Sequence, residues 1–242
     1  MRWVLIAFPL LALWAAACSG GSTATISDSG PVLGTIPWTS PEQATYSVSQ
    51  GDTTGTGTFS ILAGDNSLVF SQKFDIPANQ VTDEVTVETD PTTLAPIKVD
   101  RTTVDVDPDI NRTCEATYGN GNVTVLQKEK DQEHTDTVSV PTAHYDAWTD
   151  LFLWRTLNFS EGFRTRYTDV LSCNPRKSEV ITVVLEVKGR ESVTLPSGAY
   201  QAWHLKVDSG GSTQDAWYNV DPPHVLLKYD NGAQIFQLTS VQ

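Results

Sequence analysis

Basic residues are scarce in this sequence. Only 16 lysines and arginines stand against 29 aspartates and glutamates, and the net charge at neutral pH is −13. A protein this acidic is repelled by the phosphate backbone of nucleic acids and by anionic lipid surfaces. Nucleic acid is therefore excluded as a partner.

Histidine and cysteine are scarce as well, with four and three residues. The sequence also lacks the Gly-x-Ser-x-Gly pattern of serine hydrolases with an α/β fold. The histidines show no paired spacing of the kind that zinc sites use; they are His134, His144, His204 and His224. We therefore predict no catalytic residues, no metal and no cofactor. Because catalytic triads assemble in space, a hydrolase stays as the least favoured alternative.

Asp105, Asp107 and Asp109 form the most obvious cation-binding pattern, with carboxylates at alternate positions. Calcium-binding loops use such spacing, but they also need glycine at the sixth position and an acidic side chain at the twelfth. Ile110 and Ala116 occupy those positions here. We therefore interpret the segment as a solvated acidic turn.

The first 18 residues have the layout of an export signal. Arg2 precedes an apolar run over residues 3–17, which ends in three alanines before Cys18. Fifteen helical residues span roughly 22 Å, less than the ~30 Å hydrocarbon core of a bilayer, so a permanent membrane helix is not expected. We predict a signal peptide over residues 1–17.

Cys18 indicates that the exported protein is anchored to a membrane rather than released. The segment before it resembles the motif that lipoprotein signal peptidases cut, although Ala15 stands where leucine is usual. Acyl chains on Cys18 would hold the protein outside the cytoplasm, on the cytoplasmic or the outer membrane of a bacterium. The alternative is ordinary secretion. Because residues 19–35 are mostly small and polar, we expect a flexible lipid-anchored tether over residues 18–40 and one domain over residues 41–242.

The two remaining cysteines, Cys114 and Cys173, would lie in a compartment where disulfides persist. A bond between them would close a loop of 59 residues and stabilise the fold by about 4 kcal/mol in the chain-entropy treatment. We predict that they pair. The alternative is two buried free thiols.

Alternation of apolar and polar residues dominates the domain and predicts β-strands. Asn-Gly and Gly-Gly pairs between the strands indicate hairpin turns. The sequence thus predicts an all-β, mostly antiparallel fold, with a single curved sheet or an incomplete barrel of about 12–15 strands. The candidate strands are residues 44–50, 55–62, 67–74, 84–88, 97–106, 110–118, 122–128, 135–140, 163–169, 178–187, 192–195, 199–208, 214–220, 225–229 and 234–241.

One segment, residues 142–155, breaks the alternation. Its apolar side chains recur at a helical spacing, and Thr142 is a residue type that caps helices. We predict one helix that packs across the sheet. The apolar positions are Tyr145, Trp148, Leu151 and Phe152.

Several short motifs in a fixed order carry a resemblance to a known family. They include Asp90-Pro-Thr-Thr-Leu-Ala-Pro96, Arg101, Gly119-Asn-Gly121, Tyr145-Asp146, Arg155-Thr-Leu157, Gly162, Val187-Lys-Gly-Arg-Glu191, Leu195-Pro-Ser-Gly-Ala-Tyr-Gln-Ala-Trp203 and Ala216-Trp-Tyr218. Over residues 80–242 this order resembles the bacterial exported proteins of domain of unknown function 3108. The resemblance implies a β-rich domain and export. It implies no activity and no catalytic residues.

Aromatic residues concentrate in the second half of the chain. Together with an apolar helix, they would line a cleft for an acyl chain or another apolar molecule. The candidate ligand-binding residues are Trp148, Phe152, Trp203 and Trp217. The alternative is a dry core, in which each tryptophan N–H needs a partner.

These patterns lead us to favour a cell-envelope lipoprotein that binds an apolar ligand or lipid, and to expect no enzyme. Its expected partners are the membrane, through Cys18, and an apolar small molecule or an envelope protein. The second hypothesis is a structural or protein-interaction module of the envelope. A cavity of ~300 Å³ or more beneath the helix would favour the first hypothesis.

Overall fold

The computed structural model describes residues 28–107, 111–175 and 177–242. The described chain forms one sheet of 15 strands, in the order β8-β7-β6-β5-β4-β3-β2-β1-β15-β14-β13-β12-β11-β10-β9. The strands are β1 (Glu42–Gln50), β2 (Thr53–Ala63), β3 (Leu68–Ile76), β4 (Val81–Thr89), β5 (Pro96–Val104), β6 (Arg112–Gly119), β7 (Asn122–Glu129), β8 (Gln132–Ser139), β9 (Tyr145–Asp146), β10 (Arg164–Leu171), β11 (Glu179–Leu195), β12 (Gly198–Ser209), β13 (Ser212–Asn219), β14 (Leu226–Asp230) and β15 (Ile235–Val241).

Nearly every strand pairs antiparallel with its neighbour in sequence, as hairpin turns require. Asn120 and Gly121, both at positive φ, form one such turn between β6 and β7. Two pairings differ. The first and last strands, β1 and β15, pair at the centre of the sheet, and β9 runs parallel to β10 at one edge. The predicted all-β, antiparallel class is confirmed.

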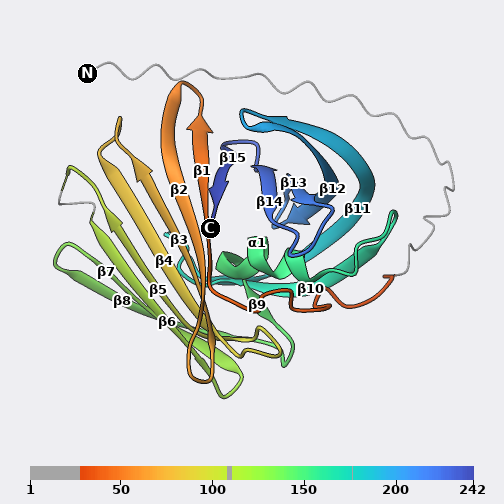
Figure 1. The fold of residues 1–242 in the computed structure, drawn as a ribbon. Helices are drawn as coiled ribbons and strands as arrows, with labels where there is room; N and C mark the ends of the chain where they lie inside the picture. Colours follow the sequence, from red (N-terminus) through yellow and green to blue (C-terminus); the bar gives the residue numbers. More distant parts are fainter. Residues whose placement is uncertain (1–27, 108–110, 176) are drawn as a thin grey trace, which may run out of the picture.

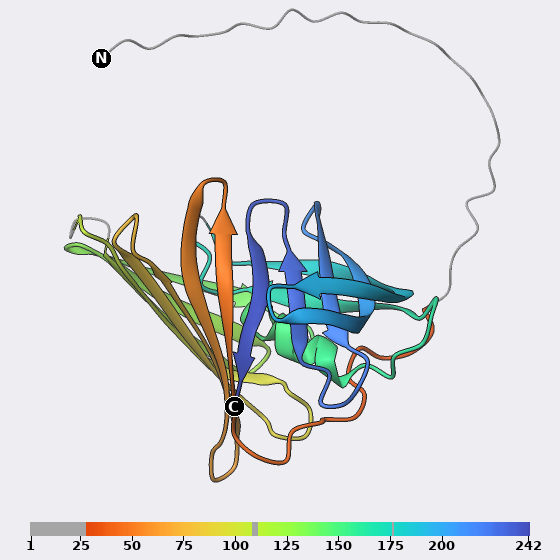
Figure 2. The same ribbon diagram turned by 45° about the horizontal axis from the view of Figure 1, so that its top comes forward.

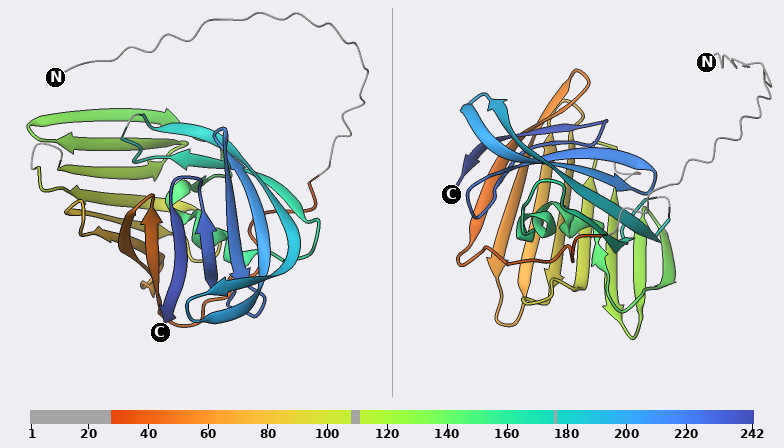
Figure 3. Two further views of the ribbon diagram at one scale, coloured as in Figure 1. Left: turned by 90° about the horizontal axis from the view of Figure 1, so that it is seen from above. Right: turned by 90° about the vertical axis from the view of Figure 1, so that its right-hand side faces the viewer.

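The sheet is strongly curved. Strands β2–β8 form a broad array, and β10–β13 curl back over the concave side, so that the short helix lies between the two parts (Figure 1). Views from further directions show the same incomplete barrel (Figures 2 and 3). In β11, the predicted strands 178–187 and 192–195 join into one, with a register shift between Val187 and Gly189. This irregularity bends the strand where the sheet curls.

The predicted helix over residues 142–155 starts five residues later than expected. A 3₁₀ turn (Ala147–Thr149) leads into α1 (Asp150–Leu153), and a second 3₁₀ turn (Trp154–Thr156) follows. Residues 145–146 instead form β9, whose pairing with β10 overrides the helical spacing. Asp146, rather than Thr142, caps the first turn, because its carboxylate accepts the Trp148 backbone N–H at 3.0 Å. Within the described ranges, no helix is long and apolar enough to cross a membrane.

The main core surrounds α1. Phe152, Leu153 and Trp154 are almost fully buried there, and Phe152 stacks on Phe70 of β3 with ring centroids 4.7 Å apart. The core also receives apolar side chains from β1, β2 and β10–β15. A smaller core around Val99 and Val125 lies beneath β4–β7. Apolar burial on the concave side thus holds the curved sheet around its helix.

The structure corrects the end of the predicted tether. Residues 28–41 pack against the domain as a strap, in which Val32 is 3% exposed. The Thr156 hydroxyl accepts the Gly34 N–H at 3.2 Å, and an added Cβ at Gly34 would lie only 2.2 Å from the Thr156 carbonyl oxygen. Apolar residues spaced among the polar ones, such as Ile36, anchor the strap. Cys18 and the predicted signal peptide lie outside the described residues.

Candidate functional site

A disulfide joins the two parts of the curved sheet. Cys114 on β6 and Cys173, just after β10, are bonded, with Cα atoms 5.8 Å apart and a sequence separation of 59. The predicted pairing is confirmed. These strands lie far apart in the sheet order, so the bond spans the concave side rather than linking neighbours.

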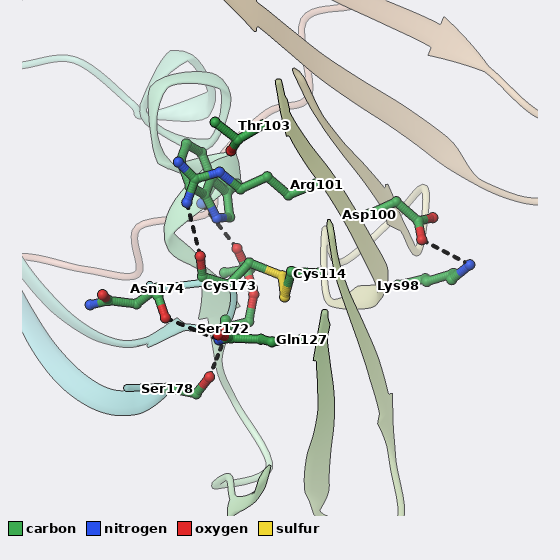
Figure 4. Close-up of a disulfide and its surroundings, with 12 residues drawn as sticks. Lys98, Asp100, Arg101, Thr103, Cys114, Gln127, Ser172, Cys173, Asn174 and Ser178 are labelled. Carbon is green, nitrogen blue, oxygen red and sulfur yellow. Dashed lines mark hydrogen bonds and ion pairs between the residues drawn. A yellow bond between two sulfur atoms is a disulfide. The ribbon is translucent and has the colours of Figure 1, made fainter. Parts of the chain in front are cut away.

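Hydrogen bonds flank the disulfide and complete what we call the seam. Arg101 Nη1 on β5 donates to the Cys173 carbonyl oxygen at 2.9 Å, and Gln127 Nε2 on β7 donates to that of Asn174 at 3.1 Å (Figure 4). Nearer the helix, Gln72 Nε2 on β3 donates to the Trp148 carbonyl oxygen at 2.6 Å. Side chains and one covalent bond therefore hold the barrel together where no backbone ladder does.

A cleft of about 510 Å³ opens beside the seam. One wall comes from β3–β5, a second from α1 and the turn before it, and the third from the ends of β12–β15. Its apolar and aromatic lining residues are Phe74, Ile76, Val81, Ala147, Trp148, Leu151, Trp154, Leu171, Pro175, Tyr229 and Phe236. Its polar lining residues are Gln72, Asp83, Arg101, Thr103, Asp150, Asn174, Ser209, Gln214, Asn231 and Gln234. The lining is thus mixed, with eleven apolar or aromatic residues and ten polar or charged ones.

An ion pair lies at one side of the cleft. Arg101 binds Asp83 through two contacts, Nε to Oδ1 at 2.9 Å and Nη2 to Oδ2 at 2.7 Å. Thr103 donates to the same Oδ1 at 3.0 Å, and the guanidinium lies 4.6 Å from the ring centroid of Trp148. The charges of Arg101 and Asp83 are therefore mutually satisfied.

A buried carboxyl lies on the helix side. Asp150 is 7% exposed, and its Oδ1 accepts the Tyr167 hydroxyl at 2.6 Å; the same hydroxyl accepts Trp154 Nε1 at 2.8 Å. Burial raises the pKa of Asp150 to about 7. Burial, followed by the charge of Asp150, holds the pKa of Asp169 on β10 well above its ordinary value.

A third buried carboxyl stands beneath the seam. Asp146 is fully buried and accepts the Tyr118 hydroxyl at 2.5 Å, so it ties β9 to β6. Burial raises its pKa as well. The sequence reasoning missed these three carboxyls. The available signal was alternation on β10, which puts Asp169 on the same buried face as Thr165 and Tyr167.

Only one of the four predicted ligand residues lines the cleft, namely Trp148. Phe152 points into the closed core against Phe70. Trp203 stacks on Phe159 with centroids 5.7 Å apart. Their burial corresponds to the dry-core alternative.

Trp217 lies on the opposite face of its strand from the buried Tyr218. There it stacks on His204 with centroids 4.8 Å apart, and its Nε1 donates to Glu191. The four predicted residues therefore do not converge.

The other candidate patterns lie apart from the cleft. Asp105 and Asp107 belong to a turn in which the Asp105 carboxylate accepts the Asp107 N–H, while Asp109 lies outside the described residues. No group of three histidine, cysteine or acidic side chains is placed to hold a metal ion within the described part of the chain. The histidines are scattered: His134 contacts Asp136, His144 contacts the Pro141 carbonyl, His204 contacts Asp215 and His224 contacts the Asn219 carbonyl.

Comparison with solved structures supports the incomplete-barrel fold. A crystal structure from Brucella abortus, described as a beta-barrel-like protein of domain of unknown function DUF1849, superposes with a TM-score of 0.58. The alignment covers 84% of this chain and 97% of that one at 11% identity, so it shows a shared fold alone.

Comparison with sequence families identifies the chain more closely. No curated protein matches it. The family described as protein of unknown function DUF3108 matches residues 44–235, which confirms the resemblance and extends it to the first strands. This chain therefore belongs to the DUF3108 family.

Proposed function

We propose that this protein is a non-enzymatic binding module of the bacterial cell envelope, which holds an apolar or amphiphilic small molecule in the cleft beside α1. The observation that carries the proposal is the cleft itself. Its volume of about 510 Å³ falls within the ~300–1,000 Å³ of small-molecule sites, and its lining combines apolar and aromatic side chains with polar groups, as an amphiphile requires.

Contacts within the protein hold the walls of the cleft in place. The seam fixes β5 to the segment after β10 through the disulfide and Arg101. The helix wall is fixed by the core, where Tyr218 donates to the Leu151 carbonyl at 2.9 Å. A preformed site loses little conformational entropy when it binds.

The envelope location rests on Cys18 and the leader before it. A disulfide between Cys114 and Cys173 supports this, because such bonds persist mainly outside the cytoplasm. The test is metabolic labelling with a radioactive fatty acid in a bacterial host. Label should enter the wild type and be absent from Cys18→Ser. Equal labelling of both would refute the anchor.

Binding is tested by organic extraction of protein purified from its envelope fraction, followed by mass spectrometry. We expect a co-purifying apolar molecule, and displaceable binding of the neutral dye Nile red. Trp148→Ala should weaken dye binding because Trp148 lines the cleft. Trp217→Ala is the matched control, since Trp217 lies on the outer face. Absence of both a co-purified molecule and dye binding would refute the proposal.

A second candidate function is a protein-interaction module, and the observation that favours it is strand β8. It ends the sheet order, and its residues Gln132–Thr135 are exposed, so one edge of the sheet is open to pairing. Cross-linking in the envelope from a photoreactive residue at Thr135 would test this. A single reproducible partner would support it, and background proteins alone would count against it.

A further inference from the structure

The cleft has an unequal charge balance. Its charged lining residues are Asp83, Arg101 and Asp150, that is, two acids and one base. The single base is largely committed to partners within the protein. Three of its five N–H groups donate to both Asp83 oxygens and to the Cys173 carbonyl, and its flat face lies over Trp148. An anionic head group would therefore have to compete with an existing ion pair.

Asp150 is different, because no basic group among the described residues is paired with it. Hydrogen bonds from Tyr167 and Asp169 lower its pKa, whereas burial and the charge of Asp146 raise it. Asp150 is more than nine-tenths buried and lines the cleft. A carboxylate in such surroundings is stabilised by an added cation more than one on the surface is, because the local dielectric constant is lower.

Neutral pH is close to the titration midpoint of this carboxyl, since burial raises its pKa to about 7. A bound cation can therefore take the place of the proton at little cost. The chain as a whole carries a charge of −13, which attracts cations toward the cleft and repels anions.

We propose that the ligand of the cleft is an amphiphile with an ammonium-type head group, which lies against Asp150 while its hydrocarbon body packs on Trp148 and Leu151. This inference rests on the proposed function and specifies its ligand class. The Asp83–Arg101 pair, in which the charge of Arg101 is already neutralised, would provide selectivity against fatty acids and other anionic amphiphiles.

The experiment compares three compounds with the same twelve-carbon chain: dodecylamine, 1-dodecanol and dodecanoate. Each displaces Nile red from the purified full chain carrying Cys18→Ser, at concentrations below micelle formation. We expect dodecylamine to displace half of the dye at a concentration about tenfold lower than dodecanoate, a ratio that corresponds to one favourable charge contact. Dodecanol should fall between them.

Three variants assign the preference to residues. Asp150→Asn should bring dodecylamine to the level of dodecanol. Asp65→Asn, the matched control, removes an exposed carboxylate at the far end of β3 from the cleft and should keep the wild-type order. Asp83→Asn should strengthen dodecanoate, because it releases Arg101 from its ion pair.

The outcomes separate the two proposals. Equal or stronger displacement by dodecanoate in the wild type would overturn the ammonium proposal while leaving binding intact. So would an unchanged order in Asp150→Asn, or the same loss of preference in Asp65→Asn. If Nile red binds and none of the three compounds displaces it, or if it does not bind, the proposed function itself fails.

Discussion

Removal of the disulfide should destabilise the fold by about 4 kcal/mol. Cys114 and Cys173 are 59 residues apart, and closing a loop of this length removes conformational entropy from the unfolded chain that corresponds to about 4 kcal/mol. The double variant Cys114→Ala/Cys173→Ala loses this constraint. Seam contacts such as Arg101 to the Cys173 carbonyl remain, so the variant should still fold. Urea unfolding followed by tryptophan fluorescence gives the free energy in each case.

The same experiment contains its own control. Wild-type protein in dithiothreitol should fall to the stability of the double variant, and the variant itself should not respond to dithiothreitol. Because Arg101 and Asn174 belong to both the seam and the cleft, Nile red affinity should fall together with stability. A loss below about 1 kcal/mol would show that the seam is held by its hydrogen bonds alone, contrary to the reasoning from loop length.

Three further predictions concern buried charge and close packing. Between about pH 4 and pH 7 the folded chain keeps the Asp150 proton that the unfolded chain has released. The free energy of unfolding should therefore fall by up to about 4 kcal/mol as the pH rises through this window. Urea titrations at four pH values should show a shallower fall for Asp150→Asn, and an identical pH dependence in the two proteins would contradict the assignment. Glu42→Gln leaves the Arg155 guanidinium, which is 4% exposed, without its anionic partner at 2.7 Å. This variant should lower the free energy of unfolding by about 3 kcal/mol or more, measured by thermal unfolding. A change within error would mean that the pair does not stabilise the fold. Gly34→Ala places a Cβ against the Thr156 carbonyl oxygen and should release the strap from the domain. Limited proteolysis should then cut the variant near residue 34 faster than the wild type. Equal cleavage of the two proteins would show that the strap accommodates the added methyl group.

Local patterns carried much of the fold. Alternation and Asn-Gly turns predicted the antiparallel class and most strand positions, because a strand places successive side chains on opposite faces whatever lies around it. The Cys114–Cys173 pairing followed from the number of cysteines left after Cys18 and from the expected compartment. Both inferences depend on properties that the chain displays without its tertiary neighbours.

Tertiary contacts overrode local patterns at two places. Residues 145–146 have helical spacing, yet they join β10 as a strand, since the edge of the sheet offers backbone hydrogen bonds. Residues 19–35 are mostly small and polar, yet Val32 within this stretch is buried by the domain. Periodicity cannot register a partner elsewhere in the chain, which lies 24 residues away for Tyr145 and 122 residues away for Gly34.

The cleft was decided by the tertiary structure alone. Trp148, Phe152, Trp203 and Trp217 have the same aromatic character in the sequence, but only Trp148 reaches the cleft. Asp150 and Asp169 meet because the sheet curls around α1 and brings β10 beneath the helix. The sequence by itself determined the strands, the turns and the cysteine pair, since these follow from backbone geometry and composition. The direction of the curl, and hence which side chains converge, followed from how the whole core packs.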